Sequence, residues 1–490
     1  MSSFVIPFIK TITKKLLAFP FVFICIFLIC AHKYVASYFS TMTGAEFLFF
    51  MQTPMEGADK RLVHIFINKC LLNPFIYSFL ICFMPDIIQL LKNICNYRKK
   101  LLLRIYRVLC AKYYVLLLIL LSLLISGYYL TKFNFIRELW NMDRAPYGTF
   151  FEKHFTYPEA QNIHLKQKKN LIVISVESLE KTFENKHFFK HSLVPHLEKL
   201  EKEGVQFSNY KNGWNTSNTI SHVIALFTGL PKSCGYKGLI NKHGHKVNFL
   251  NGYYALGNYL IDNGYQTYSV QGSDGKFAGQ KNFFQNHGIQ HTVDAAVIKN
   301  KYYPNNTENN WGYNDEIVFN TAKKILQQRQ SPAPYFMFIQ TIDTHFNYLP
   351  KVKNHHKFDN KYYNVIYNTS LQIYRFVNWL KSQPNYDNTV IVIIGDHLRM
   401  GNNFPMAKDR RIYNLFLNAP RPKTTNRKFS QVDLFPTILE ALGANIKGHR
   451  LGIGVSVFSD KKTLSEEYKR ETLYKELSKR SKLNEDLWKI

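Results

Sequence analysis

Residues 388–397 read NTVIVIIGDH, an apolar run that ends on an aspartate and a histidine. Three other segments have the same form: NLIVISVE at 170–177, QTYSVQG at 266–272 and YFMFIQTID at 335–343. Strands buried on both faces of a parallel sheet are apolar throughout, and functional residues gather at their carboxyl ends. These four segments therefore predict neighbouring strands of a mostly parallel sheet.

Helical segments are expected between and after these strands. The candidates lie at 193–203, 219–228, 253–263, 315–328, 364–382 and 431–442. The alternation predicts an α/β domain with helices on both faces of a mostly parallel central sheet. We place this domain at residues 169–458 and expect a charged helical tail at 459–490.

Three apolar segments occupy the first third of the chain, at about 16–38, 62–91 and 113–130. A helix needs roughly 20 apolar residues to cross a bilayer. The first and third segments meet this requirement, whereas charged residues and a proline interrupt the second. We predict a transmembrane domain of about three helices at 1–131, and whether the second segment fully spans is left open.

Basic residues are distributed unevenly around these segments. Lys10, Lys14 and Lys15 precede the first segment, and the loop before the third is rich in Lys and Arg without any acidic residue. Cytoplasmic loops carry the excess of Lys and Arg. We therefore predict a multi-pass membrane protein whose N-terminus is cytoplasmic and whose chain after about residue 131 lies on the outer side of the membrane. The aromatic-rich residues 132–168 are expected to form an amphipathic connector at the membrane interface.

The formal net charge is +29, from 63 Lys and Arg against 34 Asp and Glu. No zinc-finger pattern, helix-turn-helix pattern or basic helix interleaved with aromatics accompanies it, which argues against nucleic acid as a partner. An anionic membrane surface fits the charge together with the apolar segments. Only Cys234 lies beyond residue 111, so we expect no disulfide framework in the C-terminal domain.

Four residues fall where strands end or a helix begins: Glu177, Thr219, Asp396 and His397. Two carboxylates, an imidazole and a hydroxyl suit Zn²⁺ or Mn²⁺, and suit Mg²⁺ less because of the imidazole. A bound metal would lower the pKa of the Thr219 hydroxyl, and the helix N-terminus would offer N–H donors to phosphoryl oxygens. Each residue alone also has an ordinary structural role, such as helix capping by Thr219. Their combination predicts a site for one divalent metal ion.

Nine ordered motifs carry a resemblance to a known family. They are ESLE at 177–180, TISHVIALFTGLP at 219–231, QGSDGKFAGQKNF at 271–283, HG at 287–288, WGYND at 311–315, TIDTH at 341–345, NTVIVIIGDHLRMGNN at 388–403, DLFPTILEALG at 433–443 and RLGIGVS at 450–456. Together they resemble the membrane phosphoglycerol transferases of the alkaline phosphatase/sulfatase superfamily. Two groups of enzymes in that family are matched: the lipoteichoic acid synthases, and the enzymes that decorate periplasmic glucans. The resemblance covers about residues 169–457.

The resemblance implies an alkaline-phosphatase/sulfatase-like fold and puts the metal ligands at Glu177, Thr219, Asp396 and His397. Thr219 is the implied nucleophile, which forms a covalent intermediate with the phospho-head group. Thr216 is a nearby rival, although the spacing to the following Gly-Leu-Pro favours Thr219.

Residues outside this set are expected to contact the substrate. His345 matches a family histidine that contacts the substrate phosphate or the leaving group. Gln271, Asp274, Lys281 and His287 are expected to line the head-group pocket.

Two positions depart from the family pattern. Ser221-His222 stands where the family has Ala-Gly after the nucleophile, and Thr228 stands where the glucan-modifying enzymes tend to have Cys. These departures bear on substrate identity more than on catalysis.

The function that the resemblance implies is metal-dependent transfer of glycerol phosphate from phosphatidylglycerol to an envelope glycan. A phosphoethanolamine transferase acting on lipopolysaccharide or another surface glycan is the first alternative. A phosphodiesterase, which would pass the intermediate to water, and a non-catalytic sensor are further alternatives. Sulfatase activity itself is not expected, because no C/S-x-P-x-R element occurs. The expected partners are a phospholipid donor and a glycan acceptor, and we expect a monomer. The resemblance also implies a location in the bacterial inner membrane, with the catalytic domain facing the periplasm.

Overall fold

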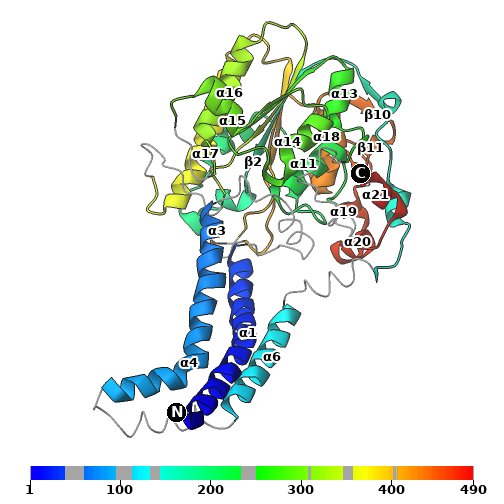
Figure 1. Ribbon diagram of the computed structural model, residues 1–490. Coiled ribbons are helices and arrows are strands. Elements are labelled where there is room, and N and C mark those ends of the chain that lie inside the picture. Colours follow the sequence, from blue (N-terminus) through cyan, green and yellow to red (C-terminus); the bar gives the residue numbers. More distant parts are fainter. Residues whose placement is uncertain are drawn as a thin grey trace. The chain divides into compact units, whose positions relative to one another are not determined.

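The computed structural model describes residues 2–38, 60–94, 113–132, 144–232, 250–306, 311–345, 357–400, 404–405 and 407–488. The chain divides into two compact units. The helical unit contains residues 1–44 and 60–140, and the α/β unit contains residues 45–59 and 141–490. Both units are drawn in Figure 1.

The helical unit is built from long apolar helices. Its elements are α1 (Ser2–Tyr38), α3 (Lys60–Phe66), the π-helical η1 (Ile67–Leu72), α4 (Asn73–Ile94) and α6 (Tyr114–Lys132). Three stretches, Thr13–Tyr38, Arg61–Ile88 and Tyr114–Lys132, are long and apolar enough to cross a membrane. The second of these continues through two prolines, Pro74 and Pro85, and through the charged Lys69 and Asp86.

One ion pair explains how the second stretch tolerates an acidic residue. Lys15 Nζ on α1 lies 2.5 Å from Asp86 Oδ2 on α4. A charged side chain inside or near a bilayer needs an opposite charge or access to the interface. Because Lys15 supplies the opposite charge, Asp86 does not interrupt the helix, and α1 packs against α4 as well as α6.

A six-stranded sheet in the order β5-β4-β6-β2-β7-β8 forms the centre of the α/β unit. Its four central strands are β4 (Gln266–Gln271), β6 (Tyr335–Gln340), β2 (Asn170–Val176) and β7 (Thr389–Gly395), and neighbours among them pair in parallel. Every residue of β2, β6 and β7 is buried, which is the reason for their continuous apolar sequences. The predicted mostly parallel sheet is confirmed.

Two edge strands complete the sheet. β5 (His291–Val293) pairs in parallel with β4, and β8 (Asn414–Leu417) pairs antiparallel with β7. Neither was predicted from the sequence, since three or four residues are too few to show a pattern.

Helices cover both faces of the sheet, as predicted (Figure 1). Leu171 and Val173 of β2 pack in one core cluster with α11 (Thr219–Thr228) and α18 (Leu434–Ala441). The alternate residues of β2 point to the opposite face. There they pack in a second cluster with helices α10 (Pro195–Glu201), α16 (Asp315–Gln328) and α17 (Lys361–Lys381). The sheet is therefore the middle layer of three.

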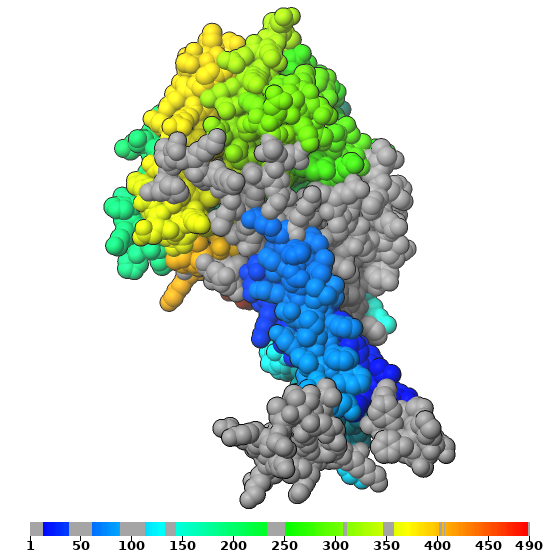
Figure 2. Space-filling view, turned by 60° about the vertical axis from the view of Figure 1, so that its left-hand side comes forward, coloured from blue at the N-terminus to red at the C-terminus, as the bar shows by residue number. Residues whose placement is uncertain are grey.

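The first face also carries α13 (Leu256–Asp262) and α14 (Gln280–Asn286), whose buried residues join the same cluster as α11. The space-filling view shows the green segments that contain α13 to α16 and the yellow segment of α17 adjoining on the surface (Figure 2).

The described part of the predicted connector, residues 144–168, packs within the α/β unit. α8 (Phe150–His154) inserts Phe151, which is 6% exposed, into the core around α11. β1 (Ile163–Leu165) pairs antiparallel with β10 (Ala444–Ile446). Phe151 and Ile163 are buried in the protein core, whereas Tyr147 and Tyr157 are exposed. The place of this connector at a membrane interface stays a prediction. Residues 133–143 lie outside the described residues.

The C-terminal tail folds into short helices. They are α19 (Leu464–Glu467), α20 (Arg470–Leu477) and α21 (Lys482–Leu487). α20 and α21 both pack against α8, and Leu473 and Trp488 are buried in the core. The tail is charged and helical as expected, and it packs against the segment that contains α8.

Candidate active site

The ends of two neighbouring strands bring the predicted acidic residues and histidine together. Glu177 directly follows β2, and Asp396 and His397 directly follow β7, which pairs with β2 in parallel. Thr219 is the first residue of α11, and the side chain of Asn218 caps that helix. The sheet edge and the helix N-terminus thus place all four predicted residues in one group.

The distances within this group are short. Thr219 Oγ1 lies 3.3 Å from Glu177 Oε2 and 3.5 Å from His397 Nε2. His397 Nε2 lies 3.6 Å from Glu177 Oε1 and 3.4 Å from Asp396 Oδ2. Glu177, Asp396 and His397 are buried, and their ligand atoms converge closely enough to hold a metal ion.

The chemistry of these atoms fits a divalent cation. His397 Nδ1 lies 3.0 Å from the Leu398 carbonyl oxygen. We assign the ring proton to Nδ1 from this contact, which leaves Nε2 as a lone pair facing the carboxylates. Asp396 Oδ2 is also buried and faces His397 Nε2. Several lone pairs therefore point at one place, and a bound cation would stabilise them.

Burial strongly affects the two carboxyl groups. Loss of hydration raises the pKa of Glu177, and the nearby Asp396 raises it further. Burial also raises the pKa of Asp396, although its Oδ1 accepts hydrogen bonds from the backbone N–H groups of Ser178 and His397. A divalent ion would offset this cost by stabilising the charged forms. Oxygen and imidazole ligands together suit Zn²⁺ or Mn²⁺.

The loop after β6 carries His345 to the same edge of the sheet. Thr341 Oγ1 accepts a hydrogen bond from the Glu177 N–H at 3.0 Å, and Thr344 Oγ1 donates to the Glu177 carbonyl at 2.5 Å. The His345 ring packs against Trp311 with 4.4 Å between ring centroids. His345 is close enough to Glu177 to lower the pKa of that carboxyl group. The structure thus brings His345 beside the metal-site residues.

The predicted head-group residues between 271 and 287 are more dispersed. Gln271 ends β4, is buried and donates to Ser273 Oγ at 3.2 Å. Asp274 accepts from a backbone N–H two residues later. Lys281 forms an ion pair with Asp294 at 3.0 Å. Within the described part of the chain, no hydrogen bond or ion pair joins these side chains to Glu177 or to one another, so their role in binding a head group stays a prediction.

His287 lies in a different environment from the one expected. It is fully buried, with Nδ1 2.7 Å from the Phe283 carbonyl oxygen and Nε2 3.0 Å from the Leu250 carbonyl oxygen. Burial lowers its pKa. Because both ring nitrogens face backbone carbonyls, His287 joins the end of α14 to the chain at Leu250. We therefore leave it out of the substrate-binding candidates.

Ser178 is a site residue that the sequence analysis missed. Its Oγ donates to Glu177 Oε1 at 2.6 Å, and its φ of 53° lies in the left-handed region. Such backbone conformations in non-glycine residues are uncommon and gather at functional sites. The tight turn after β2 thereby orients the Glu177 carboxylate, and the ESLE motif was the available signal.

His222 is buried one turn after Thr219 on α11. It is 0% exposed, and neither ring nitrogen has a hydrogen-bond partner among the described residues. Burial lowers its pKa to about 3, and the nearby His397 adds to this effect. His222 is therefore neutral at pH 7, and its polar atoms are buried without compensation.

Replacing His222 by leucine is expected to raise the free energy of unfolding by about 1–2 kcal/mol, because a buried polar group without a partner is removed. Thr228 on the same helix is the matched control. Its Oγ1 donates to the Ile224 carbonyl oxygen and accepts from the Leu230 N–H, so Thr228→Val should lower the melting temperature. Thermal unfolding in detergent measures both. Equal destabilisation by the two variants would show that His222 does have a partner.

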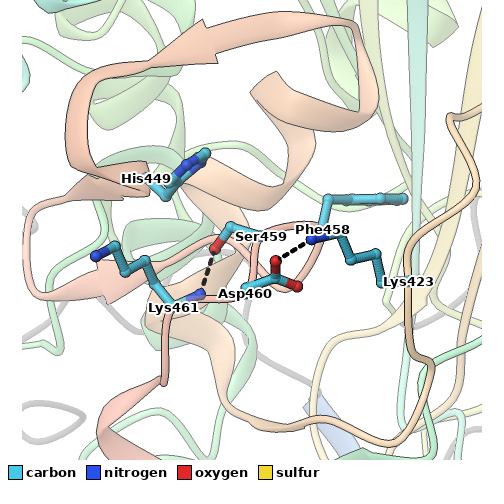
Figure 3. A pocket seen from close by; sticks show the side chains of 6 residues that line it. All are labelled: Lys423, His449, Phe458, Ser459, Asp460 and Lys461. Carbon is cyan, nitrogen blue, oxygen red and sulfur yellow. Dashed lines mark hydrogen bonds and ion pairs between the residues drawn. The ribbon is translucent and has the colours of Figure 1, made fainter.

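A surface pocket of about 460 Å³ lies elsewhere on the α/β unit. Its lining residues, drawn in Figure 3, are Lys423, His449, Phe458, Ser459, Asp460 and Lys461. Lys423 and Asp460 form an exposed ion pair. None of the predicted site residues lines this pocket, and we assign it no role in the chemistry.

Comparisons with known proteins agree with the fold and the motifs. A family model described as Sulfatase matches residues 169–444. Phosphoglycerol transferase I of Shigella flexneri is 31% identical over 318 residues, which cover 62% of this chain and 41% of that protein. Phosphoglycerol transferase I of Escherichia coli (strain 55989 / EAEC) is 30% identical with the same coverage. The chain thus spans about two fifths of the length of these curated relatives.

Solved structures show the same fold at lower identity. An alkaline phosphatase superfamily protein from Vibrio parahaemolyticus matches with a TM-score of 0.51 and 22% identity, covering 62% of this chain and 72% of that chain. The lipoteichoic acid synthase LtaP from Listeria monocytogenes matches with a TM-score of 0.51 and 19% identity, covering 61% of this chain and 80% of that chain. The family match runs through the whole central sheet and includes all four candidate metal-site residues, and the chain belongs to the sulfatase family.

Proposed function

We propose that this protein is a metal-dependent phosphotransferase of the inner membrane that moves glycerol phosphate from phosphatidylglycerol to an envelope glycan. One observation carries the proposal. The Thr219 hydroxyl stands at the N-terminus of α11 and lies 3.3 Å from Glu177 Oε2, within a buried group that could hold a divalent ion. The relatives at 30–31% identity are named phosphoglycerol transferases, which favours glycerol phosphate over phosphoethanolamine.

The proposed reaction has two displacements. Thr219 Oγ1 loses its proton and bonds to the phosphorus of the lipid head group, the bond from phosphorus to the diacylglycerol oxygen breaks, and that oxygen takes up a proton. Glycerol phosphate then remains on Thr219 as a phosphodiester. An acceptor hydroxyl then loses its proton and bonds to the same phosphorus, the bond from phosphorus to Thr219 Oγ1 breaks, and Oγ1 takes up a proton. Covalent catalysis replaces one difficult transfer by two easier ones.

The surrounding residues have distinct roles in this proposal. Glu177, Asp396 and His397 would hold the divalent ion together with Thr219. When bound, that ion supplies positive charge that lowers the pKa of the Thr219 hydroxyl and stabilises the phosphoryl oxygens. The first backbone N–H groups of α11 would donate to those same oxygens.

The apolar helices would hold the site near its lipid donor. Three spans would put a cytoplasmic N-terminus and the catalytic unit on opposite sides of the membrane, so the proposal has that unit in the periplasm with its glycan acceptor. Restricting donor and enzyme to one membrane raises the effective concentration of the donor. The large positive charge favours anionic lipids such as phosphatidylglycerol.

His345 is proposed to donate the proton to the departing diacylglycerol oxygen. His345→Gln is expected to lower kcat by about 10²–10⁴-fold, because general acid catalysis contributes about that much. Diacylglycerol release measured against pH should also lose its dependence on the acid form of this histidine. His291→Gln is the matched control, since His291 is exposed and stacks on Tyr268 at the far edge strand. Full activity of both variants would remove His345 from the mechanism.

The experiment that tests the function uses the full-length protein in detergent micelles with Mn²⁺. Phosphatidylglycerol labelled in its head group is supplied with and without a periplasmic glucan, and diacylglycerol and labelled glucan are quantified. Equal molar yields of both products are the expected result. If the protein used labelled phosphatidylethanolamine and not phosphatidylglycerol, the transferred group would be phosphoethanolamine and not glycerol phosphate. Equal release of free head group with and without glucan would indicate a phosphodiesterase.

A further inference from the structure

A buried glutamine lies behind the candidate site. Gln431 is the first residue of the short 3-10 turn η6 (Gln431–Asp433), which precedes α18, and its exposed fraction is 0%. Asp433 anchors this turn, because its carboxylate accepts from the backbone N–H groups of Ser430 and Val455. The position of the Gln431 side chain is therefore fixed by the fold of its own segment.

The Gln431 amide reaches two separate parts of the site. Its Oε1 accepts from Thr216 Oγ1 at 2.7 Å and from the Gly213 N–H at 3.0 Å. Its Nε2 lies 3.1 Å from three acceptors, which are Asn212 Oδ1, the Thr216 carbonyl oxygen and the Asp396 carbonyl oxygen. Two N–H groups serve three oxygens, so one of these bonds is shared. Every polar atom of the amide is satisfied.

A second path leads from this amide to His397. Asn212 Oδ1, which accepts from Gln431, also accepts from the Leu398 N–H at 3.4 Å. The Leu398 carbonyl oxygen in turn faces His397 Nδ1 at 3.0 Å. The Gln431 side chain is thus connected directly to the backbone of Asp396 and, through Asn212 and Leu398, to the ring of His397.

The other contacts of Gln431 hold the loop that leads into α11. Residues 212–218 precede Thr219 directly, and Gly213 approaches Ser430 so closely that a Cβ there would lie 2.9 Å from Ser430 Oγ. Asn215 within the loop has a φ of 52°. The hydrogen bonds from Gln431 hold this loop, together with two others, from Asn215 Nδ2 to the Lys232 carbonyl oxygen and from the Tyr474 hydroxyl to the Asn212 carbonyl oxygen.

We infer that Gln431 is a positioning residue, which fixes the Thr219 loop relative to Asp396 and His397. The inference rests on the proposed function for its kinetic consequence, but the positions of the ligands themselves depend only on the structure. A displacement of about 1 Å at a reacting group costs about 100-fold in rate. Residues that orient metal ligands typically contribute about 10–100-fold to metal affinity.

Gln431→Met tests the inference, because methionine matches the length of glutamine and offers no strong hydrogen bond. We expect kcat to fall about 100-fold, with the KM for phosphatidylglycerol within a factor of about three of wild type because no lipid contact is removed. Calorimetry of the full-length protein without lipid should show Mn²⁺ affinity lower by about 10–100-fold. Asn212→Ala removes only the path from Gln431 through Asn212 to Leu398, and it should lower kcat and Mn²⁺ affinity about tenfold each.

Thr437→Val on α18 is the matched control. Thr437 is 0% exposed, and its Oγ1 donates to the Asp433 carbonyl oxygen and accepts from the Val457 N–H. Its loss should lower the melting temperature while kcat and Mn²⁺ affinity stay near wild type. Unchanged kcat and Mn²⁺ affinity in Gln431→Met, or equal losses of both in Thr437→Val, would overturn the inference. A wild-type protein that binds Mn²⁺ but transfers no head group would overturn the proposed function and leave the calorimetric test of Gln431 intact.

Discussion

Thr219→Ala is expected to lower the rate of head-group transfer by about 10⁴–10⁶-fold, the range seen when a catalytic nucleophile is removed. Thr216, the rival threonine, is not placed to replace it, because it is 0% exposed and its Oγ1 donates to Gln431 Oε1 at 2.7 Å. Thr219 Oγ1 instead faces Glu177 and His397. Diacylglycerol release from phosphatidylglycerol measures the loss.

The fold of the variant should be intact, which makes the result interpretable. The side chain of Asn218, not that of Thr219, accepts the hydrogen bond that caps α11. The free energy of unfolding of Thr219→Ala, judged from its melting temperature, should therefore lie within about 0.5 kcal/mol of the wild-type value. Thr219→Ser, which keeps a hydroxyl, should retain activity well above the alanine variant. Mass spectrometry of acid-quenched wild-type protein should find glycerol phosphate on the peptide that contains Thr219, and its presence on another residue would contradict the assignment.

The central strands and the metal-site residues were predictable because local sequence determines both. An apolar run buried on both faces defines a parallel strand, and the residue that follows it lies at the functional edge of the sheet. Glu177, Asp396 and His397 satisfy this rule. The edge strands β5 and β8 were not predicted, because a strand of three or four residues is too short to show a sequence pattern.

Residues that act through long-range contacts were not predictable. Gln431 contacts a loop 215 or more residues earlier in the chain, and the motif that begins two residues later, at Asp433, does not indicate these contacts. His287 shows the converse. Its motif resembles the family, yet both of its ring nitrogens face backbone carbonyls, and a motif alone carries no information about burial.

Removing the divalent metal should abolish transfer and also reverse the stability order of two proteins, wild type and Glu177→Gln. The pKa of Glu177 is raised in the folded state by burial and by Asp396. The folded protein therefore holds this proton more tightly than the unfolded chain, and the free energy of unfolding falls as the pH rises above the usual range of a glutamate. A neutral glutamine does not carry this cost. At pH 7.5 in EDTA, Glu177→Gln should melt at a higher temperature than wild type.

Adding Mn²⁺ should restore the opposite order. Binding to the folded state alone stabilises wild type by about 2.7 kcal/mol when the ion is at 100 times its Kd, whereas Glu177→Gln lacks one ligand and should gain little. Glu471→Gln, which changes an exposed glutamate on α20, is the control and should follow wild type in both buffers. Parallel melting curves for wild type and Glu177→Gln with and without Mn²⁺ would show that Glu177 is no ligand. The reversed order of the two melting temperatures distinguishes a carboxylate that binds metal from one that stabilises the fold. Only a metal-binding carboxylate destabilises the folded protein when the metal is absent.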